Sequence, residues 1–280
     1  PEADAMLMFV HRKLTDGDIY FVDNRSGRAE SVDAAFHVEG KAPELWDAAT
    51  GVALPASYQI AGGHTTVPLH LDPYGTVFVV FRKQATAPSV QLPEQVETEV
   101  PNTESDLNQS WYVTFPPARG GPASLKAYPQ TPRVPQSIKF DRLTSWSDNS
   151  NAGIKYYSGT ATYLRSIEIP ESVIKPGVHV WLDLGDVRDL AEVRVNNQDL
   201  GILWKTPYRI DITGALRPGN NFFRIEVTNL WVNRMIGDQQ PWALKKYTFA
   251  DFTPYKADSP LLPSGLLGPV RLYSVASPRE

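Results

Sequence analysis

Three stretches of alternating apolar and polar residues in the second half of this 280-residue chain constrain its fold more than any other feature. They cover residues 178–184, 191–196 and 223–228. A period of two puts the apolar side chains on one face of a strand, because successive side chains leave opposite faces of the sheet. Asn196-Asn197 closes the second stretch and tolerates the positive φ of a tight hairpin. The pattern predicts antiparallel strands in a β-sandwich or jelly roll, and an all-β fold.

The rest of the chain divides by composition. Residues 1–84 contain strand-sized apolar runs separated by Gly and Pro turns, which predicts a small β-sandwich. Residues 85–110 carry Pro, Glu, Thr and Gln with little periodicity, and such a composition predicts a linker or a strap over the surface. Residues 111–280 return to strand-like patterns. We therefore expect two β-sandwich domains, 1–84 and 111–280, on either side of that segment.

Charge and composition exclude several function classes. The net charge is −4 and there is no long basic run, which argues against a nucleic-acid partner. The chain has no cysteine, so a disulfide, a thiolate metal site and a cysteine nucleophile are ruled out. No apolar run approaches the roughly 18–20 residues that span a bilayer, so no membrane partner is predicted. Because the chain begins with Pro1 rather than Met, we expect it to be part of a longer gene product.

Several ordered motifs resemble glycoside hydrolases. The run AEVRVNNQDLGILWKTPYRIDITGALRPGNNFFRIEVTN, from residue 191, resembles the sugar-binding jelly roll of family 2, a galactose-binding-like fold. The continuation from Asn229 to Asp238 is similar to the C-terminal region of family 106, the α-L-rhamnosidases. The runs VHRKLTDGDIYFVDN, GKAPELWDAATG and GTVFVVFRK in the first 84 residues resemble the segment that follows the catalytic barrel in the same family.

The resemblance implies a parent enzyme that removes terminal α-L-rhamnose from plant or bacterial glycans. In family 106 the catalytic carboxylates belong to a (β/α)8 barrel, and a barrel needs about 250 residues of alternating strand and helix. No such pattern is present, so we predict no catalytic residue and no activity of this chain alone. Its expected partner is the missing N-terminal barrel of the same protein, which it would support, and the resemblance implies a periplasmic or secreted location.

Two alternatives remain open. The chain could be a freestanding carbohydrate-binding module with its own ligand pocket, which calorimetric titration with rhamnosides would reveal. It could instead be a structural fragment of a cell-surface protein. Rhamnose-containing glycans are the expected carbohydrate partners in the first case.

A cluster after the third alternation is the best candidate for sugar binding. Tryptophan offers a flat face to the apolar side of a sugar ring, while Arg, Asn and Asp hydrogen-bond its hydroxyls. Packing of this cluster against a neighbouring catalytic domain is the competing interpretation, and it is slightly favoured. The candidate residues are Trp231, Asn233, Arg234, Asp238 and Trp242.

No metal or cofactor is predicted. The polar loop from Ser147 to Asn151 could offer oxygen ligands to calcium, but it lacks EF-hand spacing and is better explained as a solvated loop. The chain contains no G-x-S-x-G motif, so a serine nucleophile is not indicated. The five histidines, at positions 11, 37, 64, 70 and 179, lack the spacing of zinc ligands.

Overall fold

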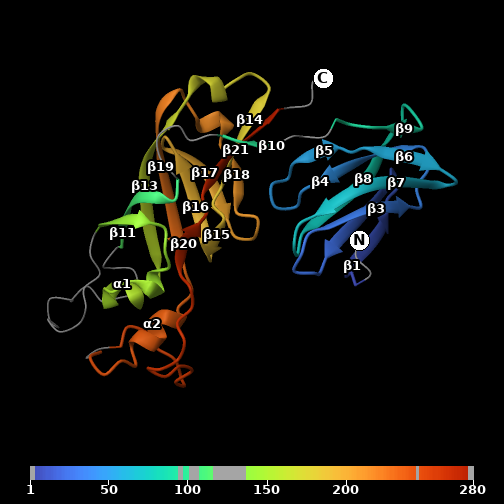
Figure 1. The fold of residues 1–280 in the computed structure, drawn as a ribbon. Helices are drawn as coiled ribbons and strands as arrows, with labels where there is room; N and C mark the ends of the chain where they lie inside the picture. The colour runs from blue at the N-terminus through green and yellow to red at the C-terminus, as the bar shows by residue number, and fades with distance from the viewer. Residues whose placement is uncertain (1–3, 94–96, 101–106, 116–136, 244–245, 277–280) are drawn as a thin grey trace. The chain divides into compact units, whose positions relative to one another are not determined.

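The structure is a computed structural model, and it describes residues 4–93, 97–100, 107–115, 137–243 and 246–276. The chain divides into two compact units, Pro1–Glu94 and Gln95–Glu280 (Figure 1). Each unit has its own hydrophobic core, and both are built almost entirely from antiparallel strands. The prediction of an all-β chain with sandwich folds is therefore confirmed.

The first unit is a sandwich of two sheets. One sheet has the strand order β1-β2-β8-β4-β5, and the other has the order β3-β7-β6-β9. Side chains from both sheets, including Val67, Val79 and Phe81, form a single buried cluster. The strands are β1 (Leu7–Lys13), β2 (Asp18–Asn24), β3 (Glu30–Phe36), β4 (Lys41–Trp46), β5 (Ala53–Pro55), β6 (Tyr58–Ala61), β7 (His64–Leu71), β8 (Thr76–Gln84) and β9 (Ser89–Val90).

The five-stranded sheet of this unit is apolar on its outer face as well as on its core face. One row of register partners crosses all five strands on the face opposite the core, and it consists of Val10, Phe21, Phe78, Trp46 and Ala53. The rings of Phe21 and Phe78 lie 5.1 Å apart, centroid to centroid. An antiparallel sheet that faces water normally alternates apolar and polar residues, so this row is typical of a sheet covered on both faces.

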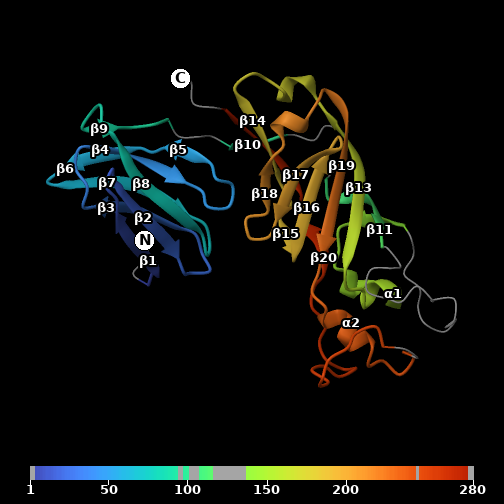
Figure 2. The ribbon, with the colours of Figure 1, turned by 180° about the vertical axis from the view of Figure 1, so that it is seen from behind.

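The second unit holds a six-stranded sheet in the order β12-β11-β13-β19-β16-β17, a four-stranded sheet in the order β10-β21-β14-β18, and the pair β15-β20. Figure 2 shows β13, β19 and β16 side by side. The strands are β10 (Glu97–Glu99), β11 (Gln109–Thr114), β12 (Ile138–Arg142), β13 (Thr160–Ile169), β14 (Val178–Asp183), β15 (Asp186–Arg188), β16 (Leu190–Val195), β17 (Gln198–Leu203), β18 (Arg209–Asp211), β19 (Gly219–Thr228), β20 (Gly265–Gly268) and β21 (Arg271–Ala276).

The three alternating stretches are all strands, but they do not form one continuous ladder. The second and third, β16 and β19, are neighbours, whereas the first, β14, lies in the four-stranded sheet between β18 and β21. Asn196 and Asn197 join β16 to β17 with φ of 51° and 68°, as the predicted hairpin requires. The core between the sheets includes the Trp146 indole, which donates to the buried Tyr163 hydroxyl over 2.6 Å.

Helices are short in the described part of the chain. The α-helices are α1 (Ala152–Lys155) and α2 (Val232–Gly237), and the 3-10 turns are η2 (Trp146–Asp148), η3 (Glu171–Val173) and η4 (Thr213–Ala215). None of the helices among these residues is long and apolar enough to cross a membrane.

The segment predicted as a linker or strap, residues 85–110, contributes strand pairing to both units. Its strand β9 pairs with β6, while β10 pairs with β21, and β11 already begins at Gln109. Part of this segment therefore satisfies its backbone groups by strand pairing. Residues 94–96 and 101–106 of this segment, and the Pro- and Gly-rich stretch 116–136, lie outside the described residues.

The loop considered for calcium uses its amide oxygens for local hydrogen bonds. The Asn149 side chain accepts from the Asn151 backbone N–H over 2.8 Å, and the Asn151 side chain accepts from the Gly153 N–H over 2.9 Å. The second bond caps the start of α1. No group of three or more His, Cys, Asp or Glu residues that could hold a metal ion occurs among the described residues.

Candidate functional site

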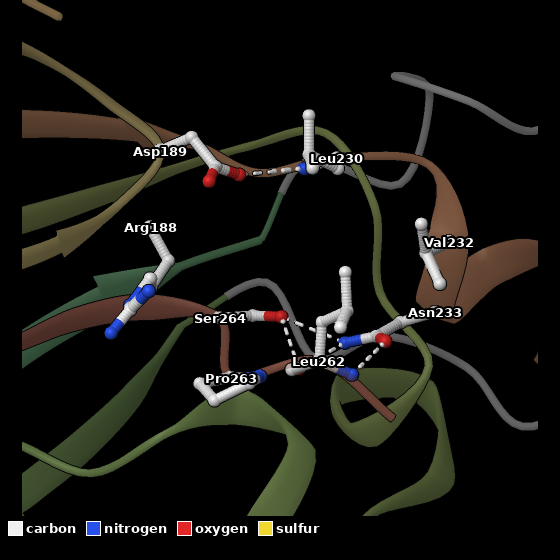
Figure 3. A pocket seen from close by; sticks show the side chains of 8 residues that line it. All are labelled: Arg188, Asp189, Leu230, Val232, Asn233, Leu262, Pro263 and Ser264. Atoms are coloured by element: carbon white, nitrogen blue, oxygen red, sulfur yellow. Dashed lines mark hydrogen bonds between the residues drawn. The ribbon is translucent and has the colours of Figure 1, made fainter. Parts of the chain in front are cut away.

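A pocket lies in the second unit where β15, the end of β19, α2 and the segment before β20 meet. Its empty space amounts to about 350 Å³ when the open solvent at its mouth is included. Figure 3 shows the side chains that line it: Arg188, Asp189, Leu230, Val232, Asn233, Leu262, Pro263 and Ser264. One of the five predicted residues, Asn233, belongs to this lining.

Asp189 ties the pocket to the six-stranded sheet. Its backbone N–H donates to the Thr228 carbonyl over 2.8 Å, and its carbonyl accepts from the Tyr208 hydroxyl over 2.8 Å. Its carboxylate accepts from the Leu230 backbone N–H over 3.2 Å (Figure 3). The neighbouring Arg188 guanidinium donates to Asp186 over 2.8 Å, and the Arg188 side chain is 45% exposed. The two side chains therefore have different partners and point away from each other (Figure 3).

Asn233 fixes the opposite wall. Its side-chain amide donates to the Leu262 carbonyl over 2.8 Å and to the Ser264 hydroxyl over 2.7 Å, and its oxygen accepts from the Leu262 N–H over 2.8 Å (Figure 3). The side chain is almost fully buried, as expected for an amide whose hydrogen-bonding groups are satisfied internally. Asn233 thus joins α2 to the segment that leads into β20.

Arg234 and Asp238 are brought together, as the sequence grouping suggested, but they face inward. Arg234 Nε lies 2.9 Å from Asp238 Oδ1, one helical turn along the chain. Asp238 Oδ2 also accepts from the Tyr247 N–H, the Thr248 N–H and the Thr248 hydroxyl, over 2.7, 2.7 and 2.8 Å. Burial lowers the pKa of the Arg234 guanidinium, and the adjacent carboxylate opposes that shift. The pair holds the loop after α2.

The two tryptophans of the predicted cluster differ from each other in exposure and in contacts. Trp231 is the residue before α2, between the pocket residues Leu230 and Val232, and it is 48% exposed. Trp242 is half-buried, and its ring lies 5.7 Å from the Tyr156 ring. Trp231 is therefore exposed but is not among the lining residues, whereas the Trp242 ring packs against Tyr156.

The pocket combines polar and apolar side chains. Arg188 and Asp189 supply a donor and an acceptor, and the apolar side chains of Leu230 and Leu262, which are 53% and 41% exposed, flank them. Asp189 is the one carboxylate among the lining residues, so a pair of acidic groups across a glycosidic bond is not assembled here.

Sequence reasoning missed Arg188, Asp189, Leu262 and Ser264. Arg188 and Asp189 follow the apolar stretch that ends at Leu184, and they form a short charged break before the next stretch. This charged break between two apolar stretches was the feature of the sequence that could have indicated these two residues. Leu262 and Ser264 are about 30 residues farther along than α2, and only their hydrogen bonds to Asn233 place them at the pocket.

Residues 1–60 match the sequence model of a family described as alpha-L-rhamnosidase, glycoside hydrolase family 106. A solved rhamnosidase from Novosphingobium sp. PP1Y superimposes with a TM-score of 0.87 at 44% sequence identity, over 98% of this chain and 24% of that one. A curated protein of Formosa agariphila, provisionally named a beta-glucuronidase, is 30% identical in an alignment of length 273 that covers 80% of this chain and 24% of the relative.

These similarities confirm the resemblance to family 106 and relate the chain to rhamnosidases and glycoside hydrolases. The chain spans about a quarter of the length of the relatives it matches.

Proposed function

We propose that this chain is the non-catalytic β-sandwich portion of an α-L-rhamnosidase-like glycoside hydrolase, and that it supports a catalytic barrel supplied by the rest of the polypeptide. The observation that carries the proposal is the match of nearly the whole chain to about a quarter of a rhamnosidase. The pocket with a single carboxylate agrees with a role outside catalysis, because glycoside hydrolysis uses two.

The outer face of the first unit supports the idea of a covering partner. Val10 and Met8 on β1 are 56% and 52% exposed, and the row that starts at Val10 continues through Phe21, Phe78 and Trp46. An apolar row of this length in contact with water is costly, at about 25 cal/mol per Å² of apolar surface. The segment matched by the family model, residues 1–60, carries three of these four row residues. The proposed occupant of the face is the remainder of the rhamnosidase-like polypeptide.

Carbohydrate binding at the pocket is the second part of the proposal. Rhamnose is a 6-deoxy sugar, so it presents a methyl group as well as hydroxyls. The polar groups of Arg188 and Asp189 suit the hydroxyls, and the apolar Leu230 and Leu262 suit the methyl. In this proposal Trp231 stacks on the ring, Trp242 reinforces the wall, and Asn233, Arg234 and Asp238 hold the pocket in shape. The proposed partner is a rhamnose-containing glycan. The proposed location of the parent enzyme is the periplasm or the outside of the cell.

The supporting role is tested by a chimera in which this chain replaces the matching quarter of the Novosphingobium rhamnosidase. In the chimera, Val10→Lys should lower the temperature at which activity is lost by about 5 °C or more. This estimate assumes that burying an unpaired charge costs about 3 kcal/mol of stability. It also assumes that each kcal/mol lost lowers the melting temperature by about 2–4 °C. Activity after heating for a fixed time, measured on an aryl α-L-rhamnoside, gives that temperature.

The matched control is Val52→Lys, because Val52 is similarly exposed at 48% and lies in the turn before β5, outside the row. It should leave the temperature unchanged. Both variants should leave the unfolding of the isolated chain unchanged, since each alters an exposed side chain. If the two variants of the chimera lose activity at the same temperature, the proposal that the rest of the polypeptide covers this face is wrong.

A further inference from the structure

Two histidines that are far apart in the sequence meet in the first unit. His37 Nε2 lies 3.2 Å from His64 Nε2, and the two rings are 4.1 Å apart, centroid to centroid. His37 is exposed and His64 is half-buried. Their separation of 27 residues resembles no metal-binding motif, so the sequence did not indicate the pair.

The two backbones that carry these histidines are held together by strand pairing. His64 is the first residue of β7 and pairs with Ala61 of β6 across a two-residue turn. The last register pair of β3 and β7 is Phe36 with Thr65, so His37 and His64 occupy the next cross-strand position. The buried Thr65 hydroxyl donates to the Val38 carbonyl over 2.7 Å and fixes the chain on the far side of His37.

A backbone carbonyl determines which nitrogen of His64 carries the proton. His64 Nδ1 lies 2.9 Å from the Gly62 carbonyl oxygen, which can only accept, so Nδ1 is the protonated nitrogen. His64 Nε2 is then the acceptor, and His37 Nε2 donates to it over 3.2 Å. A metal ion would replace the proton between the two nitrogens, and the bond from His64 Nδ1 to the Gly62 carbonyl is of the kind that orients metal-binding imidazoles.

We propose that His37 and His64 form a binding site for a divalent transition-metal ion through their Nε2 atoms. Metal–imidazole bonds are about 2.0–2.1 Å long, so nitrogens 3.2 Å apart reach one ion at an N–metal–N angle of about 100°. That angle suits tetrahedral Zn²⁺ and tetragonal Cu²⁺. The described residues supply no group of three or more such ligands, so water completes the coordination.

The order of affinity for different ions follows from the ligand type. Two imidazoles favour Cu²⁺ over Zn²⁺, and oxygen-preferring Mg²⁺ and Ca²⁺ should not bind. The site does not depend on the proposed relation to a rhamnosidase.

The test is calorimetric titration of metal-free chain with CuSO₄ and then with ZnCl₂. The wild-type chain should bind one equivalent of Cu²⁺ at this site, more tightly than Zn²⁺. His37→Ala and His64→Ala should each weaken binding by about tenfold or more. The matched control is His70→Ala, because His70 is an exposed histidine on the same strand whose Nδ1 contacts the Ser31 hydroxyl, and it should leave binding unchanged.

Electron paramagnetic resonance of the Cu²⁺ complex should show coupling to two nitrogens in the wild type and to one in either single variant. Absence of binding, or weak binding that is equal in all four proteins, would overturn the proposal. Because His37 is exposed, thermal unfolding of its variant should match that of the wild type, which separates loss of a ligand from loss of the fold.

Discussion

Asp238→Ala is expected to destabilise the second unit by about 3–5 kcal/mol, because it leaves the buried Arg234 guanidinium without its partner. The Asp238 side chain is fully buried, and it accepts from the backbone N–H groups of Tyr247 and Thr248, which would also lose their acceptor. Hydrogen exchange at these two amides should accelerate by about 100-fold or more, since each 1.4 kcal/mol corresponds to a factor of ten.

The measurement is amide hydrogen exchange followed in separate peptides, so that exchange in the loop after α2 is read separately from exchange in the first unit. Asp251→Ala is the matched control, since Asp251 is exposed on the same loop, and its exchange should equal that of the wild type. Arg234→Met should be milder than Asp238→Ala, because the carboxylate would keep its three donors from Tyr247 and Thr248. Equal exchange in Asp238→Ala and Asp251→Ala would show that the ion pair does not hold the loop.

Trp231→Ala is expected to abolish measurable binding of a methyl α-L-rhamnoside to the isolated chain. Removal of a tryptophan at the centre of a contact commonly costs at least about 2 kcal/mol, or about 30-fold in Kd. Weak sugar binding would then pass beyond the range of calorimetry. Trp231 is exposed between two pocket residues, so its removal should leave the fold intact.

Trp204→Ala is the matched control for this experiment. Trp204 is 61% exposed and follows β17, outside the pocket lining, so its variant should bind like the wild type. Equal loss in both variants would point to nonspecific stacking. If the wild-type chain binds no rhamnoside, the carbohydrate-binding part of the proposal is wrong and the supporting role stands alone.

The strands were predictable because their pattern is local. The alternations that became β14, β16 and β19 follow directly from which side chains face the core, and Asn196-Asn197 marked the β16–β17 hairpin. Sheet membership was not predictable in this way. β14 pairs with β21, which lies almost 100 residues further along the chain, and pairing over such distances leaves no periodic trace in the sequence.

The candidate site was partly predictable for a similar reason. The residue types near α2 indicated a cluster, and the structure does join Arg234 to Asp238 over one helical turn. The sequence could not show that the Asp238 carboxylate turns toward the Tyr247 and Thr248 amides, because those residues are nine and ten positions away. Likewise, His37 and His64 meet only because β3 and β7 pair in a particular register.

The most direct test of the proposed function is hydrolysis of an aryl α-L-rhamnoside by the purified 280-residue chain, compared with the rhamnosidase chimera. We predict that the chain alone releases the aryl group no faster than buffer, while the chimera is active. Release by the isolated chain at an enzymatic rate, persisting through successive purification steps, would contradict the account, because the bond-breaking groups would then lie within these two β-sandwich units.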